Sequence, residues 1–136
     1  MTQVESGSRM HWTQQQLAKF SSADDFYVAP FRADGKTYGT PTFIWSVVAK
    51  GRLFVRAYNG TASSWYKSTL EQKAGRIVLT GRSFKVAFNP AAGLDNDLID
   101  QEYKEKYASS RYLKAMISDK ARETTLEVTP TEPQYR

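Results

Sequence analysis

The chain has 136 residues, of which 40% are hydrophobic and 13% aromatic, so it is long enough for one domain with its own core and too apolar to be disordered throughout. It contains no cysteine and a single histidine, which excludes disulfides, thiolate metal sites, cysteine nucleophiles and any site that needs two histidines. The net charge of +5 favours an anionic partner, whether a phosphorylated small molecule, a nucleic acid or an acidic membrane.

The two ends of the chain are polar. We expect residues 1–12 to be a loose segment, residues 13–130 to form one domain and residues 131–136 to be a polar tail. No run approaches the roughly 18 apolar residues of a membrane span, and the first ten residues lack the apolar stretch of a signal peptide. These features predict a cytoplasmic protein with no membrane partner.

The first expected elements are a short helix and a strand. Thr13 and Gln16 have the spacing of a capping box, which predicts a helix that begins there and reaches about Phe20. Aromatic and β-branched residues over 26–31 then predict a strand. The sequence Ala-Asp-Gly-Lys at 33–36 is a strong signal for the turn that ends it.

The middle of the chain predicts two more strands and a helix. A strand is expected over 37–48, where the apolar run indicates a central position, and another over 53–57. Residues 62–73 have a helical pattern that ends near Gly75, where we expect a left-handed cap.

The last third predicts three strands and two helical pieces. Strands are expected over 77–79, 84–88 and 124–129, and helices over 94–107 and 111–120. About six strands, mostly joined by short turns, with helices between them, predict an α+β fold built on a small antiparallel β-barrel with flanking helices.

The segment 53–67 is the best candidate for a binding site. It is a strand that ends at Arg56, a glycine-containing loop, and a helix start with Ser63 and Ser64. The free N–H groups and the dipole of a helix N-terminus attract anions, serine hydroxyls add donors, and Arg56 and Lys67 add charge. The alternative is an ordinary amphipathic helix with a solvated lysine.

Two aromatic residues and one further arginine extend this candidate. Trp65 and Tyr66 either wall a planar ring or pack in the core, and Arg76 follows the helix closely enough to join a phosphate site. The glycine motifs of P-loop and Rossmann proteins do not occur in the sequence, which argues against a nucleoside triphosphate or a classical dinucleotide site.

Residues 35–68 resemble the central block of the flavin-binding split β-barrel superfamily, which is pyridoxamine-phosphate-oxidase-like, and are most similar to its deazaflavin-dependent nitroreductase branch. The matching positions are 35–41, 50–55, 59–60 and 64–66. The segments DDFYVAPFR and YGTPTFIW resemble even more closely an uncharacterised bacterial family of short domains that is placed in the same superfamily.

The resemblance implies a dimeric split barrel that holds FMN or a deazaflavin coenzyme in a groove between two copies, without a metal. Residues at its phosphate end would be Arg56, Ser63, Ser64 and Lys67. Trp65 and Tyr66 would wall the groove, and Thr40, Pro41 and Thr42 would lie beside the ring.

Three functions remain open on the sequence. The first is a flavin- or deazaflavin-dependent oxidoreductase of the nitroreductase type that passes a hydride to a small organic acceptor, since a bound cofactor can supply the redox chemistry that the side chains lack. The second is a non-catalytic module for a phosphorylated or aromatic ligand. The third and weakest is a single-stranded nucleic-acid binder that uses Arg76, Arg82, Lys85 and Phe84.

Overall fold

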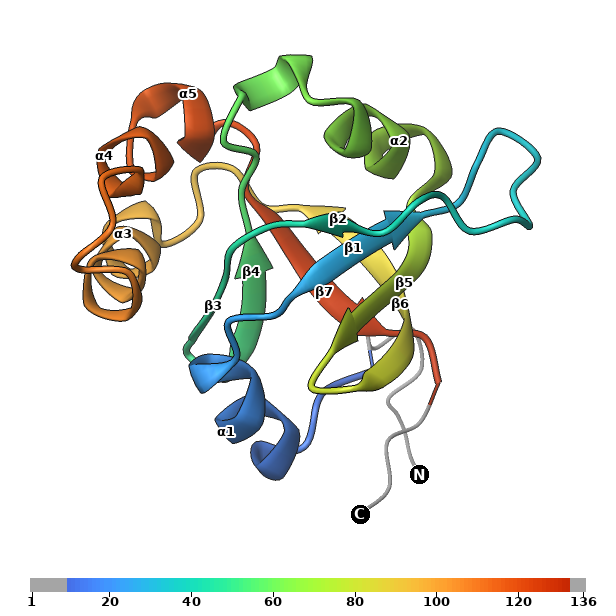
Figure 1. Ribbon diagram of the computed structural model, residues 1–136, viewed down its shortest axis with the longest axis horizontal. Helices are drawn as coiled ribbons and strands as arrows, with labels where there is room; N and C mark the ends of the chain where they lie inside the picture. The colour runs from blue at the N-terminus through green and yellow to red at the C-terminus, as the bar shows by residue number, and fades with distance from the viewer. Residues whose placement is uncertain (1–9, 133–136) are drawn as a thin grey trace.

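A computed structural model describes residues 10–132 as a curled antiparallel sheet with helices around it (Figure 1). The sheet has seven strands in the order β2-β1-β5-β6-β7-β4-β3, so the expected α+β class is confirmed with one strand more than expected. The strands are β1 (Tyr27–Pro30), β2 (Thr42–Phe43), β3 (Ser46–Ala49), β4 (Arg52–Val55), β5 (Ala74–Leu79), β6 (Arg82–Pro90) and β7 (Leu126–Pro130). Of the ends expected to be loose, 1–12 and 131–136, residues 1–9 and 133–136 lie outside the described residues, whereas Trp12 is described and is buried.

Within the described residues, five α-helices and one 3-10 turn surround the sheet. They are α1 (Gln14–Ser22), the turn η1 (Gly60–Ala62), α2 (Ser64–Gln72), α3 (Asn96–Lys106), α4 (Leu113–Met116) and α5 (Asp119–Arg122). The helix α1 begins at the expected capping box, in which the Gln16 N–H donates to Thr13 Oγ1 and the Thr13 N–H donates to Gln16 Oε1. Figure 1 shows α3, α4 and α5 gathered beside β3 and β4, away from α2. No helix within residues 10–132 has the length and apolar character to cross a membrane.

The prediction of a single strand over 37–48 is wrong, and this error accounts for the one strand more than expected. This stretch contains two short strands, β2 and β3, which pair with β1 and β4 at opposite edges of the sheet. Residues 44–45 carry the chain from one edge to the other, and the Ile44 N–H donates to Phe26 O. The barrel is therefore split between β2 and β3, a geometry compatible with a split barrel.

The end of α3 satisfies the free edge of β3 at this split. The Ser46 N–H donates to Tyr107 Oη at 3.2 Å, and Lys106 Nζ donates to Ser46 O at 2.8 Å and to Phe20 O at 3.2 Å. Edge strands leave backbone polar groups that need partners. Lys106 and Tyr107 supply those partners, so α3 closes the split with side chains in place of a neighbouring strand.

Two hydrophobic clusters lie on opposite faces of the sheet. The inner cluster contains Trp12 and Phe20, and the Trp12 indole N–H donates to Val128 O, which ties the start of the described chain to β7. The outer cluster packs Val47 and Phe54 against Ile99 and Tyr103 of α3. Burial on both faces explains the nearly continuous apolar sequences of β3 and β4.

Two helix predictions need correction. The left-handed residue after α2 is Lys73, with φ of 62°, whereas Gly75 lies within β5. The helix expected over 111–120 is broken into α4 and α5, because Ser118 has an extended backbone and its hydroxyl caps α5 by accepting from the Ala121 N–H.

Candidate functional site

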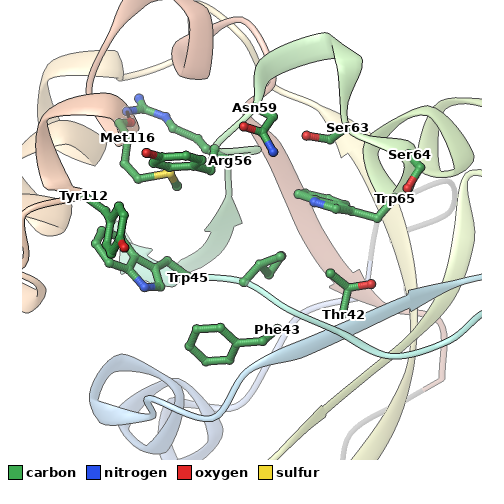
Figure 2. Close-up of a pocket in the computed structure, with 12 residues that line it drawn as sticks. Thr42, Phe43, Trp45, Arg56, Asn59, Ser63, Ser64, Trp65, Tyr112 and Met116 are labelled. Carbon is green, nitrogen blue, oxygen red and sulfur yellow. Dashed lines mark hydrogen bonds between the residues drawn. The ribbon is translucent and has the colours of Figure 1, made fainter.

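A pocket of about 450 Å³ lies beside the split in the barrel (Figure 2). Its walls come from the crossing between β2 and β3, from the end of β4 and the loop into α2, and from the segment around α4. The lining residues are Thr42, Phe43, Ile44, Trp45, Arg56, Tyr58, Asn59, Ser63, Ser64, Trp65, Tyr112 and Met116. The volume is typical of small-molecule sites, and most of the lining is aromatic or apolar.

One wall of the pocket is an indole held in a fixed orientation. The ring of Trp45 stacks on Tyr107, with centroids 3.9 Å apart and planes 2° from parallel, and Tyr107 stacks further on Tyr103. The Tyr107 hydroxyl accepts from the Ser46 N–H, which fixes the phenol ring as well. Trp45 is therefore ordered before any ligand arrives, so binding would not have to immobilise it.

The opposite end of the pocket is the start of α2. Gly60 has a positive φ of 67° and begins the turn η1, whose last bond runs from the Ser63 N–H to Gly60 O. Ser63 is the N-cap of α2, and its side chain makes no capping hydrogen bond. Figure 2 shows Trp65 projecting toward the centre of the pocket, with Ser63 and Ser64 beside it. Hydroxyls and helix N–H groups thus meet an aromatic surface at one place, which suits an anion on a planar molecule.

Arg56 lines the pocket but is already engaged in the interior. It is fully buried, its Nε donates to Thr125 Oγ1 at 3.0 Å, and its Nη1 donates to Asp100 Oδ1 at 2.5 Å and to Met116 O at 3.1 Å. Its Nη2 has no hydrogen-bond partner among the described residues. The sequence suggested a cation available to a phosphate, and the structure instead gives this guanidinium a carboxylate partner from α3.

The pocket gathers half of the residues that the sequence singled out. Thr42, Arg56, Ser63, Ser64 and Trp65 line it, while Thr40, Pro41, Tyr66, Lys67 and Arg76 do not.

The predicted site residues that do not line the pocket lie elsewhere in the fold. Tyr66 is buried in the inner core, because successive residues of a helix point about 100° apart and its neighbour Trp65 faces the pocket. Lys67 is exposed on α2, and Arg76 lies over the ring of Tyr38 at 4.7 Å on the outer side of β5. Thr40 and Pro41 are exposed in the segment that precedes β2.

Sequence reasoning missed the residues that the fold brings in from elsewhere. Phe43, Ile44 and Trp45 were assigned to a continuous strand, and the break that turns them toward the pocket has no local signal. Tyr112 and Met116 come from a segment more than 40 residues beyond the loop they face. Tyr58 and Asn59 adjoin the segment that the sequence did identify, so the glycine-containing loop was a usable signal for them.

The fold and the pocket define an α+β half-barrel with a small-molecule-sized cavity at its split. Among residues 10–132, no three acidic or histidine side chains gather where they could hold a metal ion. Residues 16–128 match the family of uncharacterized proteins conserved in bacteria (DUF2255), and the chain belongs to that family. No curated protein matches it.

Proposed function

We propose that the pocket binds a planar aromatic small molecule that carries an anionic group, and that this molecule is a flavin or a deazaflavin. The observation that supports the proposal is the meeting of two indoles, Trp45 and Trp65, with the uncapped start of α2 in one pocket of about 450 Å³. Aromatic walls favour a flat ring, and the helix start favours a negative charge. The resemblance to the flavin-binding split barrels supplies the choice of ring.

The two ends of such a cofactor fit the pocket differently. The ring suits the aromatic walls formed by Phe43, Trp45 and Trp65. The phosphate suits the hydroxyls of Ser63 and Ser64 and the α2 N–H groups, which are neutral donors. In this proposal the helix dipole and these donors bind the phosphate, because Lys67 and Arg76 lie outside the pocket and Arg56 is paired with Asp100.

The reaction that follows from this proposal is an oxidoreduction of the nitroreductase type. The bound flavin or deazaflavin supplies hydride transfer to a small organic acceptor. The chain orients the ring between its aromatic walls, excludes water from it, and offers Asn59, Ser63 and Thr42 as hydrogen-bonding groups.

The test is a titration of the purified protein with FMN and with a deazaflavin coenzyme, after its visible absorption spectrum has been recorded. We expect one of them to bind, Trp65→Leu to weaken binding by about tenfold and Ser63→Ala by several-fold, from lost stacking and one lost hydrogen bond. Lys67→Ala is the matched control on the same helix, because Lys67 is exposed and outside the pocket. If neither cofactor binds the parent protein, the proposal is wrong.

A non-catalytic binding module is the second candidate, and one observation favours it. The groups whose pKa values clearly depart from their ordinary values, such as Lys106, Tyr107 and Asp100, do not line the pocket. Catalytic sites often contain such groups. Binding without reduction of a nitroaromatic acceptor, when a reductant of the cofactor is supplied, would select this candidate over the oxidoreductase.

The weakest candidate is single-stranded nucleic-acid binding, because two of the basic residues suggested for it already contact other side chains. Lys85 pairs with Glu132 at 3.6 Å, and Arg76 lies over Tyr38, so these cations already have neighbours. Strong dependence of nucleic-acid affinity on salt concentration would be needed to revive it.

The proposal includes a homodimer. Large exposed aromatic residues lie near the mouth of the pocket, with Phe43 51%, Tyr58 46% and Tyr112 45% exposed. Aromatic residues are enriched in protein interfaces, and a second copy over this rim would cover them and close the pocket.

A further inference from the structure

A buried ion cluster lies behind the inner wall of the pocket. Asp100 of α3 is 5% exposed, and its Oδ1 accepts from Arg56 Nη1 at 2.5 Å while its Oδ2 accepts from Arg122 Nε at 3.0 Å and from Arg122 Nη2. Burial works to raise the pKa of this carboxyl, but the hydrogen bonds from Arg122 and Arg56 outweigh burial and hold the pKa below its usual value. Asp100 is therefore an ionised carboxylate between two guanidinium groups.

The cluster joins the segments that form the inner wall. Arg56 follows the last residue of β4 and also donates from Nη1 to the carbonyl of Met116, a wall residue at the end of α4. The helices α4 and α5 have four residues each, and helices this short are not stable on their own in water. Their position therefore depends on contacts with the rest of the fold. Arg56, which is bound to Asp100, reaches α4 through the carbonyl of Met116, and Arg122 of α5 binds Asp100 directly.

Two further contacts connect the region of these helices to other parts of the pocket lining. Tyr112, just before α4, packs edge-to-face on Tyr58 with centroids 5.7 Å apart. The Lys120 side chain of α5 lies directly over Gly60, where an added Cβ would be 2.6 Å from Lys120 Cγ. Gly60 begins the turn that leads to Ser63. The short helices thus touch both ends of the pocket, near Met116 and near Ser63.

We propose that Asp100 is a positioning residue for the pocket, and that through Arg56 and Arg122 it sets how large a ring the pocket accepts. Met116, which is buried, forms the inner limit of the pocket in this arrangement, and Tyr112 lies at its rim. The inference rests on the proposed function, because it concerns the ring of the ligand that the pocket binds. The charge of the carboxylate matters at this place, because an ionised Asp100 binds both guanidinium groups at once and so links Arg56, beside β4, to Arg122 of α5.

The test compares phosphate-bearing probes that differ in ring size, namely phenyl phosphate, 1-naphthyl phosphate and FMN. In Asp100→Asn the side chain keeps its shape and loses its charge, so the inner wall should loosen. We expect the ratio of the FMN affinity to the phenyl phosphate affinity to change by about threefold or more, as for coupled neighbouring residues. Leu79→Val, a buried substitution at the far end of β5, is the control for a general loss of stability. It should lower the melting temperature and leave the ratio unchanged.

A second variant and a ligand-free measurement keep the test decisive. If Asp100→Asn does not fold, Arg122→Lys keeps the positive charge, loses the paired bonds of the guanidinium and should shift the ratio in the same direction. The chain has three methionines, so a methyl spectrum of methionine-labelled protein reports directly on Met116. We expect its signal to move or broaden in the variant that folds. An unchanged ratio with an unchanged Met116 signal would overturn the positioning role while leaving the proposed function intact, whereas a parent protein that binds none of the probes overturns both.

Discussion

Tyr107 links the closure of the barrel to the wall of the pocket. Its hydroxyl accepts from the Ser46 N–H at 3.2 Å, and its ring stacks on Trp45. Tyr107→Phe removes the hydrogen bond and keeps the stack, so we expect a loss of about 1–2 kcal/mol in the free energy of unfolding and little change in FMN affinity. Tyr107→Leu removes the stack as well, and FMN affinity should fall by about twofold to tenfold. Urea unfolding and fluorescence titration measure the two effects. An equal loss of affinity in both variants would contradict the role given to the ring.

Lys106 makes stability depend on pH. Burial lowers the pKa of its ammonium group from 10.5 to about 8. Between pH 8 and pH 10.5 the unfolded chain therefore holds a proton that the folded chain has released, and stability should rise with pH across this window. Below pH 8 both states are protonated and this contribution is constant. The rise should be about 1–2 kcal/mol, after allowance for the partial exposure of the group.

The measurement is the free energy of unfolding as a function of pH for the parent protein and for Lys106→Met. The variant should lack the rise that Lys106 causes. Tyr107 acts in the opposite direction at higher pH, because burial raises its pKa from 10.0 to about 12, so the folded state keeps a proton that the unfolded state loses. Stability should consequently fall above pH 10 in both proteins. Identical pH profiles for the two proteins would show that Lys106 is not the titrating group.

At the scale of the elements, β5 packs closely against β1 at Gly75. A Cβ added there would lie 2.5 Å from both Ala29 O and Pro30 Cα, and backbone atoms cannot move aside cheaply. We expect Gly75→Ala to lower the free energy of unfolding by at least about 2 kcal/mol. Gly81→Asn is the matched substitution, because Gly81 turns from β5 into β6 with φ of +75° and an added Cβ there meets nothing within 4 Å. Asparagine tolerates this backbone conformation, so its cost should be well under that of alanine at Gly75. Thermal unfolding of the two variants decides the comparison.

Elements with local signals were predictable, and elements set by distant contacts were not. The capping box at Thr13 and Gln16 fixed the start of α1, and the strands expected over 77–79 and 84–88 correspond to β5 and β6, which pair across the turn at Thr80-Gly81. The run from 37 to 48 was misjudged because an apolar sequence suits a buried strand and a buried crossing equally well. Gly75 was taken for a helix cap because a glycine needed for close approach and a glycine needed for a left-handed turn have the same sequence signal.

At the scale of the whole molecule, the pocket could be predicted only for those lining residues that are close together in the sequence. Arg56, Ser63, Ser64 and Trp65 lie within ten residues, so a strand, loop and helix start could point to them together. Trp45 and Met116 join them only when the barrel closes. The environment of Arg56 depends on Asp100, which is 44 residues away in the sequence. A local sequence pattern could therefore not distinguish an arginine that is available to bind a phosphate from one already paired with a carboxylate.

The proposed dimer gives the last prediction for the whole molecule. Light scattering at micromolar concentration should give twice the chain mass of 15.4 kDa for the parent protein. Phe43→Glu, at an exposed rim residue of the pocket, should yield a monomer because it buries a charge in the interface. Leu94→Glu is the control, since Leu94 is exposed to a similar degree, 46%, and does not line the pocket.

The same two variants test whether ligand binding in the pocket requires the dimer. If two copies are needed to enclose the ring, FMN affinity should fall together with dimer formation in Phe43→Glu and persist in Leu94→Glu, and raising the protein concentration should restore binding by Phe43→Glu in part. A monomeric Phe43→Glu with the affinity of the parent would mean that one chain holds the ligand by itself. A parent protein that is monomeric throughout would contradict the dimer and leave Phe43 as an exposed aromatic wall of a pocket within one chain.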